Sequence, residues 1–181
     1  MAYENNISRN LVLSDEISAS TVKDLIAKIY DFNTEDDKQV KTVVNYNREP
    51  IKLIINSNGG NIYSGLALIG AIEKSVTPVY TICLGRAMSM GLWILLSGHK
   101  RYIHELATIM YHETGSWYSD KLEGVRQDLK QSEKLQEMCD RYILAKTKIT
   151  KDKLDDIILK KQDWFITANE ALELGIVDEI L

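Results

Sequence analysis

The chain has 181 residues, of which 45% are hydrophobic and 27% charged, a composition typical of one globular domain with a sizeable buried core. Lysine and arginine total 22 against 26 aspartate and glutamate residues, and the net charge of −4 argues against a nucleic-acid-binding surface. The amino terminus lacks an apolar signal segment, and no apolar stretch reaches the length of a membrane span. Neither Cys83 nor Cys139 belongs to a metal-binding or disulfide pattern, so we expect a cytoplasmic protein.

Short β-branched runs alternate with segments of helical periodicity, the pattern of βα units around a largely parallel sheet. This alternation predicts an α/β fold. The first strand is predicted at residues 10–13, and the helix that follows takes Ser20 as its cap. From Asn33 to Pro50 the polar residues predict a loop with a short helical extension in its middle.

The middle of the chain is predicted to alternate buried strands with helices around two glycine-containing junctions. Residues 101–104 and 108–112 are interpreted as two strands of a hairpin-like excursion. The other expected elements are strands at 51–56 and 79–85 and helices at about 63–74 and 90–98.

The last third of the chain is predicted to be mostly helical. A helix from about Ser119 to Lys146 is longer than a compact domain of this size needs. Thr150 is predicted to cap the next helix, and Thr167 forms a capping box with Glu170 at the start of another. The chain closes in a short strand, IVDEIL.

The two junctions, INSNGG and GRAMSMG, follow predicted parallel strands, and open α/β sheets place their sites at such carboxyl ends. Ser89 in the second junction starts a helix, where unpaired amides and the helix dipole favour a developing negative charge. Gly60 in the first lacks a side chain, so its amide is able to approach a substrate carbonyl together with the amide of Met90. Acyl transfer by a serine nucleophile requires such a pair of donors.

A serine nucleophile also needs a general base, and the chain offers three histidines. His99 lies in a charged loop and His104 near a turn, whereas His112 ends a predicted strand and is the best base. Asp163 precedes two aromatic residues that would bury and fix it as the orienting acid, but spacing alone does not choose it among the carboxylates.

Simpler explanations exist for each of these residues. A serine at a helix start is usually a cap, a histidine at a strand end is usually half-exposed, and an aspartate before aromatic residues is usually in a turn. The glycine pair also suits a plain turn or a phosphate site, although neither GxxxxGK[ST] nor GxGxxG is present. From the residues alone, a serine hydrolase is therefore one hypothesis beside these structural explanations.

Four blocks of the chain, INSNGG, TICLGRAMSMG, IMYH and DWFITANEALELGIVDEIL, resemble in order and spacing the ClpP family of serine peptidases, the Clp protease proteolytic subunits. The resemblance covers about residue 10 to the carboxyl terminus. It implies a ClpP/crotonase-like ββα superfold with a protruding handle helix, in one peptidase domain over 1–181. The head would comprise about 10–112 and 147–181, and the handle about 113–146.

The resemblance also implies a function and a set of site residues. Such a subunit hydrolyses peptide bonds of unfolded proteins inside a chamber of heptameric or tetradecameric homo-oligomers fed by an AAA+ unfoldase, without metal or cofactor and without nucleic acid or membrane. An extended substrate would add to strands near 60–62 and 113–115. The implied residues are the nucleophile Ser89, base His112 and acid Asp163, the oxyanion amides of Gly60 and Met90, and the substrate-binding residues Gly59, Asn61, Ile62, Glu113 and Thr114.

The chain departs from the family pattern at several positions. Asn58 replaces the usual proline before the glycine pair, a mild change because asparagine suits turns. Glu113 and Thr114 replace Gln-Pro after the base, which alters the charge of the cleft, and Gln162 replaces an arginine linked to ring contacts. The segment before the first strand is shorter than usual, as expected of a member carried by a phage or mobile element, and this leaves contact with an unfoldase open.

Three other functions remain as alternatives. A crotonase-fold acyl-CoA enzyme would use the same oxyanion architecture but would not need Ser89, His112 and Asp163 together. A catalytically silent structural ring subunit would have no use for an intact triad. A phage head-maturation peptidase of related fold would cleave scaffold and capsid proteins.

Overall fold

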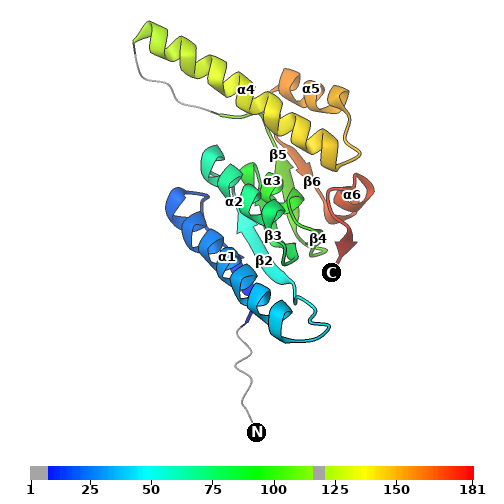
Figure 1. Ribbon diagram of the computed structural model, residues 1–181. Coiled ribbons are helices and arrows are strands. Elements are labelled where there is room, and N and C mark those ends of the chain that lie inside the picture. The colour runs from blue at the N-terminus through cyan, green and yellow to red at the C-terminus, as the bar shows by residue number, and fades with distance from the viewer. Residues whose placement is uncertain (1–7, 116–120) are drawn as a thin grey trace.

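The structure, a computed structural model, describes residues 8–115 and 121–181, and within them the centre is a seven-stranded sheet (Figure 1). Its main path runs β1-β2-β3-β4-β7 with parallel neighbours, while β5 pairs parallel with β3 and antiparallel with β6. The strands are β1 (Asn10–Leu13), β2 (Ile51–Ser57), β3 (Val79–Met88), β4 (Lys100–Ile103), β5 (Thr108–Tyr111), β6 (Trp164–Ile166) and β7 (Glu179–Ile180).

Helices cover this sheet, and the α/β class predicted from the sequence is confirmed. Helix α1 contacts α2, α2 contacts α3, and α3 contacts α4, so that neighbouring helices share one apolar layer with the buried strands. Of the helices in the described part of the chain, none is long and apolar enough to cross a membrane. The helices are α1 (Ala19–Thr42), α2 (Ile62–Lys74), α3 (Met90–Leu96), α4 (Leu122–Lys146), α5 (Lys151–Lys160) and α6 (Ala168–Glu173).

Strand β3 pairs with two different strands along its length, β4 and then β5. The prediction that residues 101–104 and 108–112 form a hairpin is therefore wrong. The first half of β3 pairs with β4 and its last residues, 86–88, pair with β5, both in parallel. The His104 N–H donates to the Cys83 carbonyl at 2.8 Å, which extends the ladder along β3 instead of reversing the chain. The sequence did not reveal this, because two short strands that both pair parallel with a third strand have the same β-branched pattern as the two strands of a hairpin.

Helix α1 is longer than predicted and starts at a different cap. Ser18, not Ser20, is the N-cap, and its hydroxyl accepts from the Thr21 amide in a capping box. The helix continues to Thr42 through the polar stretch predicted as a loop. The polar residues there form its exposed face, whereas Asp36 is fully buried and binds groups distant in the chain.

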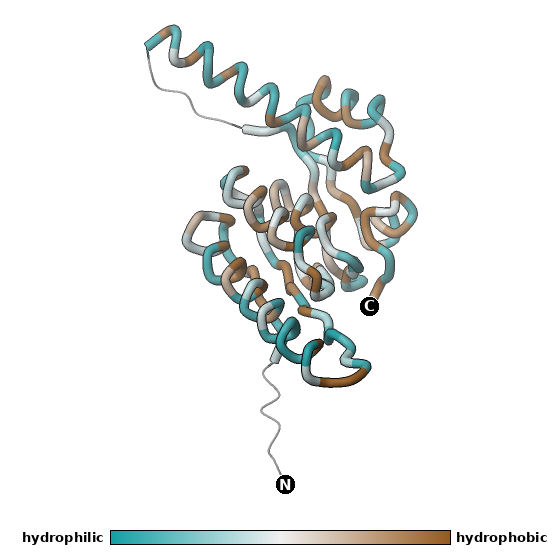
Figure 2. The backbone as a smooth tube through the Cα atoms, in the orientation of Figure 1, coloured by the Kyte–Doolittle hydropathy of each residue, from teal (hydrophilic) through white to brown (hydrophobic). Residues whose placement is uncertain are grey.

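Helix α4 extends beyond the sheet (Figure 1), and its far half carries mainly hydrophilic residues (Figure 2). In α4 the buried residues are Cys139 and Ile143, near the end that contacts the rest of the protein. There the Trp93 indole of α3 donates to the Cys139 carbonyl at 3.0 Å. The segment predicted to precede this helix as part of the handle falls partly on residues 116–120, outside the described residues.

The caps predicted in the last third are confirmed. Thr150 accepts from the Lys153 amide, and Thr167 and Glu170 form the predicted capping box. Strand β6 was not predicted, because its three residues, WFI, are too few for a period-two pattern. It nevertheless fixes the place of Asp163, which directly precedes it.

Candidate active site

Ser89 lies at the turn between β3 and α3 in an unusual backbone conformation. Its φ of 49° and ψ of −128° lie in a region that residues with a side chain rarely adopt, at a cost on the order of 1–3 kcal/mol. The Ser89 amide donates to the Met110 carbonyl of β5 at 2.9 Å, which fixes the turn. Although Ser89 holds the N-cap position of α3, its hydroxyl makes no capping bond. The capping explanation for this serine is therefore excluded.

The Ser89 hydroxyl instead forms a hydrogen bond with His112, with 2.8 Å between Oγ and Nε2. His112 directly follows β5, which lies beside the end of β3, so the two strand ends bring the side chains together. This distance is within reach for a general base. The other histidines accept backbone amides at turns, His99 from Val79 and His104 from Leu106.

The register of β5 and β6, continued by one residue, bears on the place of Asp163 relative to His112. Strands β5 and β6 are antiparallel with Tyr111 opposite Trp164, and one further step of this register sets His112 opposite Asp163. The Asp163 side chain is exposed, and no hydrogen bond joins it to His112 among residues 8–115 and 121–181. The structure thus brings Ser89 and His112 into contact, while the role of Asp163 stays a prediction.

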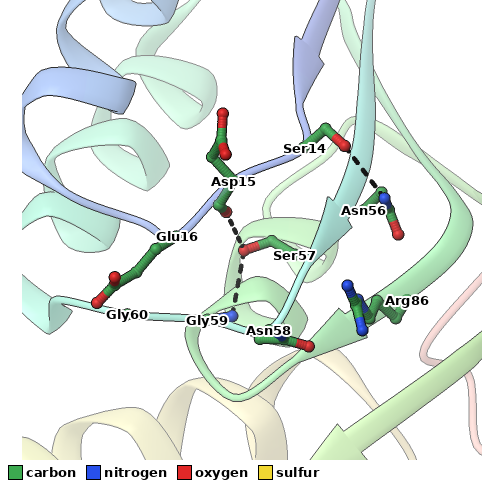
Figure 3. A pocket seen from close by; sticks show the side chains of 9 residues that line it. All are labelled: Ser14, Asp15, Glu16, Asn56, Ser57, Asn58, Gly59, Gly60 and Arg86. Atoms are coloured by element: carbon green, nitrogen blue, oxygen red, sulfur yellow. Dashed lines mark hydrogen bonds between the residues drawn. The ribbon is translucent and has the colours of Figure 1, made fainter.

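The glycine pair at the first junction is held in a conformation that only glycine adopts easily. Gly59 and Gly60 have φ angles of 105° and 146°. The Gly59 amide donates to the Ser57 hydroxyl at 3.1 Å, and that hydroxyl donates to the Asp15 carbonyl at 2.6 Å (Figure 3). On its other side the segment pairs with Ile17, whose carbonyl accepts the Asn61 amide at 2.7 Å.

Two backbone amides, one at each junction, have no acceptor within the described part of the chain. Among its hydrogen bonds, none uses the N–H of Gly60 or of Met90. Met90 is the first residue of α3, where amides lack a partner within the helix. A pocket of about 420 Å³ adjoins the glycine pair, with Arg86 of β3 among its lining residues (Figure 3).

The predicted substrate-binding residues do not form strands. Ile62 is the first residue of α2 and Asn61 is its N-cap, accepting from the Ser64 amide at 2.9 Å. Glu113 and Thr114 also lie outside the strands, and they line a pocket of about 500 Å³ against α4. The strands expected at these positions are therefore absent from them, and their part in substrate binding stays a prediction.

Sequence reasoning missed the side chains of α4 that reach the segment around His112. Gln136 and Asp140 bond to Tyr111 and Thr114, on either side of the histidine. The only sequence signal for these contacts was the four-residue spacing of Gln136 and Asp140, which sets them on the helix face that also carries Cys139 and Ile143.

Neither cysteine has the properties of a nucleophile. Burial raises the pKa of Cys83 to about 12, and burial together with the nearby Asp140 carboxylate raises the pKa of Cys139 to about 11. Across residues 8–115 and 121–181, no group of three or more histidine, cysteine, aspartate or glutamate residues is placed to hold a metal ion. Of the candidate nucleophiles, the Ser89 hydroxyl is the one that the structure joins to a histidine.

Comparison with known proteins gives consistent matches. The family model described as Clp protease matches residues 4–181. The ATP-dependent Clp protease proteolytic subunit of Borrelia garinii subsp. bavariensis is 30% identical over 175 residues, 96% of this chain and 84% of the relative. The ATP-dependent Clp protease proteolytic subunit 3 of Parasynechococcus marenigrum is 28% identical over 178 residues, 97% of this chain and 83% of the relative. A Synechococcus subunit 3 matches with the same identity and coverage.

Proposed function

Because the chain belongs to the Clp protease family, we propose that it is a serine endopeptidase subunit in which Ser89 is the nucleophile, His112 the base and Asp163 the orienting acid. The observation that carries this proposal is the 2.8 Å hydrogen bond between Ser89 Oγ and His112 Nε2. It occurs at a serine with positive φ that caps nothing, so the strained turn has a purpose other than starting a helix.

The proposed reaction uses these groups in sequence. His112 Nε2 accepts the hydroxyl proton as Ser89 Oγ attacks the peptide carbonyl, and it then donates that proton to the leaving amine. Water, deprotonated in turn by His112, hydrolyses the acyl-enzyme and restores Ser89. The amides of Gly60 and Met90 bind the developing oxyanion, and in such sites losing one donor costs about 3–4 kcal/mol of barrier.

The wider setting is part of the same proposal. The names of the relatives describe them as subunits of an ATP-dependent protease. We infer from this that the present chain forms homo-oligomeric rings, heptamers or tetradecamers, and receives unfolded proteins from an AAA+ unfoldase in the cytoplasm. Residues 113–146 act as the handle between rings, in accord with the way α4 extends beyond the sheet (Figure 1).

Covalent labelling tests the proposal directly. The purified protein is treated with a fluorophosphonate probe, which reacts with activated serines, and native mass spectrometry of the same sample reports the number of subunits. Labelling of the wild type on a particle of seven or more subunits is expected, with loss of the label in Ser89→Ala. Ser20→Ala, an exposed serine on α1, is the matched control and keeps the label.

Other outcomes contradict the proposal in distinguishable ways. A folded ring that does not react with the probe would be a structural subunit, and the peptidase mechanism would be withdrawn. Labelling that persists in Ser89→Ala would place the nucleophile elsewhere. Turnover of acyl-CoA thioesters without dependence on Ser89 would favour the acyl-CoA alternative, and cleavage limited to capsid and scaffold proteins would favour the maturation peptidase.

A further inference from the structure

One turn of α4, from Gln136 to Asp140, contacts both segments that carry the reacting pair. The carbonyl of Cys139 accepts the Trp93 indole N–H at 3.0 Å, and Trp93 belongs to α3, the helix that begins directly after Ser89. The Trp93 ring also lies 6.0 Å from the ring of Tyr111, the residue that precedes His112. This turn of α4 therefore bears on the segments of Ser89 and of His112 together.

Gln136 makes the contacts to the His112 segment. Its Oε1 accepts the backbone N–H of Thr114 at 2.7 Å and also the Thr114 hydroxyl. Its Nε2 donates to Asp140 Oδ1 at 2.8 Å and to the Tyr111 hydroxyl at 3.2 Å. The side chain thus holds the backbone two residues after His112 and the side chain one residue before it.

The donors and acceptors around position 136 require a side-chain amide there, and they fix which of its ends faces Thr114 and which faces Asp140. The Tyr111 hydroxyl is buried and donates its proton to Asp140 Oδ1 at 2.8 Å, so both sites on that side need a donor from Gln136. The Thr114 amide on the other side needs an acceptor. A glutamate at 136 would keep the acceptor but would set a second carboxylate against Asp140, leaving the donor positions unfilled.

We propose that Gln136 is a positioning residue for His112, and this inference rests on the proposed function. By fixing Tyr111 and Thr114 on both sides of the histidine, Gln136 holds the imidazole at the distance where Nε2 reaches Ser89 Oγ. Among the described residues, none of its hydrogen bonds goes to Ser89 or to the imidazole, so it acts through the residues on either side of His112. Small displacements of a base are costly: a shift of about 1 Å lowers the rate about 100-fold.

The test compares rates of fluorophosphonate labelling in Gln136→Glu and in the double variant Gln136→Glu/Asp140→Asn. The single variant is expected to label about 10- to 100-fold more slowly at the plateau of its pH–rate profile. The double variant exchanges the amide and the carboxylate and refills every donor position, so most of the rate is expected to return. Such rescue separates positioning from a mere change of charge, because the double variant has the wild-type charge.

Gln127→Glu, the same change at an exposed glutamine of the same helix, is the matched control and is expected to label at the wild-type rate. Thermal unfolding and native mass are measured for every variant, so that loss of folding or of assembly is seen separately. A folded Gln136→Glu protein that labels at the wild-type rate, or a slow double variant, would overturn the positioning role alone. A wild type that does not label would overturn the proposed function and this inference with it.

Discussion

Gly59 and Ser89 lie in contact, although they belong to different junctions of the sheet. A Cβ atom on Gly59 would come 2.7 Å from the Cβ of Ser89 and 2.9 Å from the carbonyl oxygen of Met88. These distances are shorter than van der Waals contact, and the φ of Gly59, 105°, is one that alanine rarely adopts. The two glycine-containing junctions thus form one continuous surface, and no side chain fits between them.

Gly59→Ala is therefore expected to displace the Ser89 turn. Because the added methyl group meets the Ser89 Cβ and the backbone of Met88 and Met90, none of which is the far end of a flexible side chain, the fluorophosphonate labelling rate should fall at least about 100-fold. Gly70→Ala in α2 is the matched control, since its added methyl meets nothing within 4 Å and alanine favours a helix by up to about 1 kcal/mol. Equal labelling of the two variants would show that the Gly59 contact does not control the site.

Asp163→Asn tests the third member of the proposed triad. An asparagine opposite His112 would favour the wrong tautomer of the imidazole, and the labelling rate should drop roughly 10³- to 10⁴-fold. Asp152→Asn, an exposed aspartate on α5, should leave the rate unchanged. If Asp163→Asn labels as fast as the wild type, another group orients His112.

Asp36 is expected to make the protein sensitive to acid. Burial alone would raise its pKa, but hydrogen bonds from Arg9, Thr77 and Tyr46 outweigh burial and lower the pKa from 3.8 to about 2. A carboxyl group with a lowered pKa stabilises the fold above pH about 4, and this contribution is lost as the pH falls toward 2. The contribution amounts to at most about 2–3 kcal/mol.

Urea unfolding between pH 7 and pH 2 measures this effect. Asp36→Asn should be less stable than the wild type at pH 7, because Arg9 loses its buried partner, and its stability should change less between pH 4 and pH 2. Asp31→Asn, an exposed aspartate of the same helix, should keep the wild-type pH dependence. A wild-type slope in Asp36→Asn would mean that other carboxylates govern acid unfolding.

The start of α1 gives a prediction that separates two serines. Ser18→Ala removes the hydroxyl that accepts the Thr21 amide and is expected to lower the free energy of unfolding by about 1 kcal/mol. Ser20→Ala, within the first turn, should be close to neutral, because alanine is the better helix former. Thermal or urea unfolding of the two variants decides between them, and the reverse order would restore Ser20 as the cap.

The features that were predicted correctly depend on neighbours in the sequence. The buried strands and the caps at Thr150 and Thr167 follow from periodicity and from residues three positions apart. The extension of α1 was missed because Asp36 is held by Arg9 and Thr77, which lie 27 and 41 positions away. A polar run that binds distant partners has the same composition as a loop.

The residues of the candidate site also differ in whether neighbours in the sequence were enough to predict them. Ser89, Gly60 and Met90 follow from the chemistry of a strand-to-helix junction, which is local. Asp163 was chosen from many carboxylates only through the resemblance, because its closeness to His112 depends on the pairing of β5 with β6. Gln136 was not found, since the spacing that sets it on the same helix face as Cys139 and Ile143 does not tell that it binds Tyr111 and Thr114, more than 20 positions away.

The pairing of β5 with β6 also makes the chain between them, residues 112–163, a single long loop with antiparallel stems. The entropic cost of closing a loop rises slowly with its length, by about 0.6 kcal/mol per doubling. Turns added to or removed from the far half of α4 should therefore cost the sheet little. Changes of length between Gln136 and the two strands would be less well tolerated, because they would move Gln136 away from Tyr111 and Thr114. Related chains are therefore free to differ in the length of the far half of α4 while keeping the same Ser89–His112 pair.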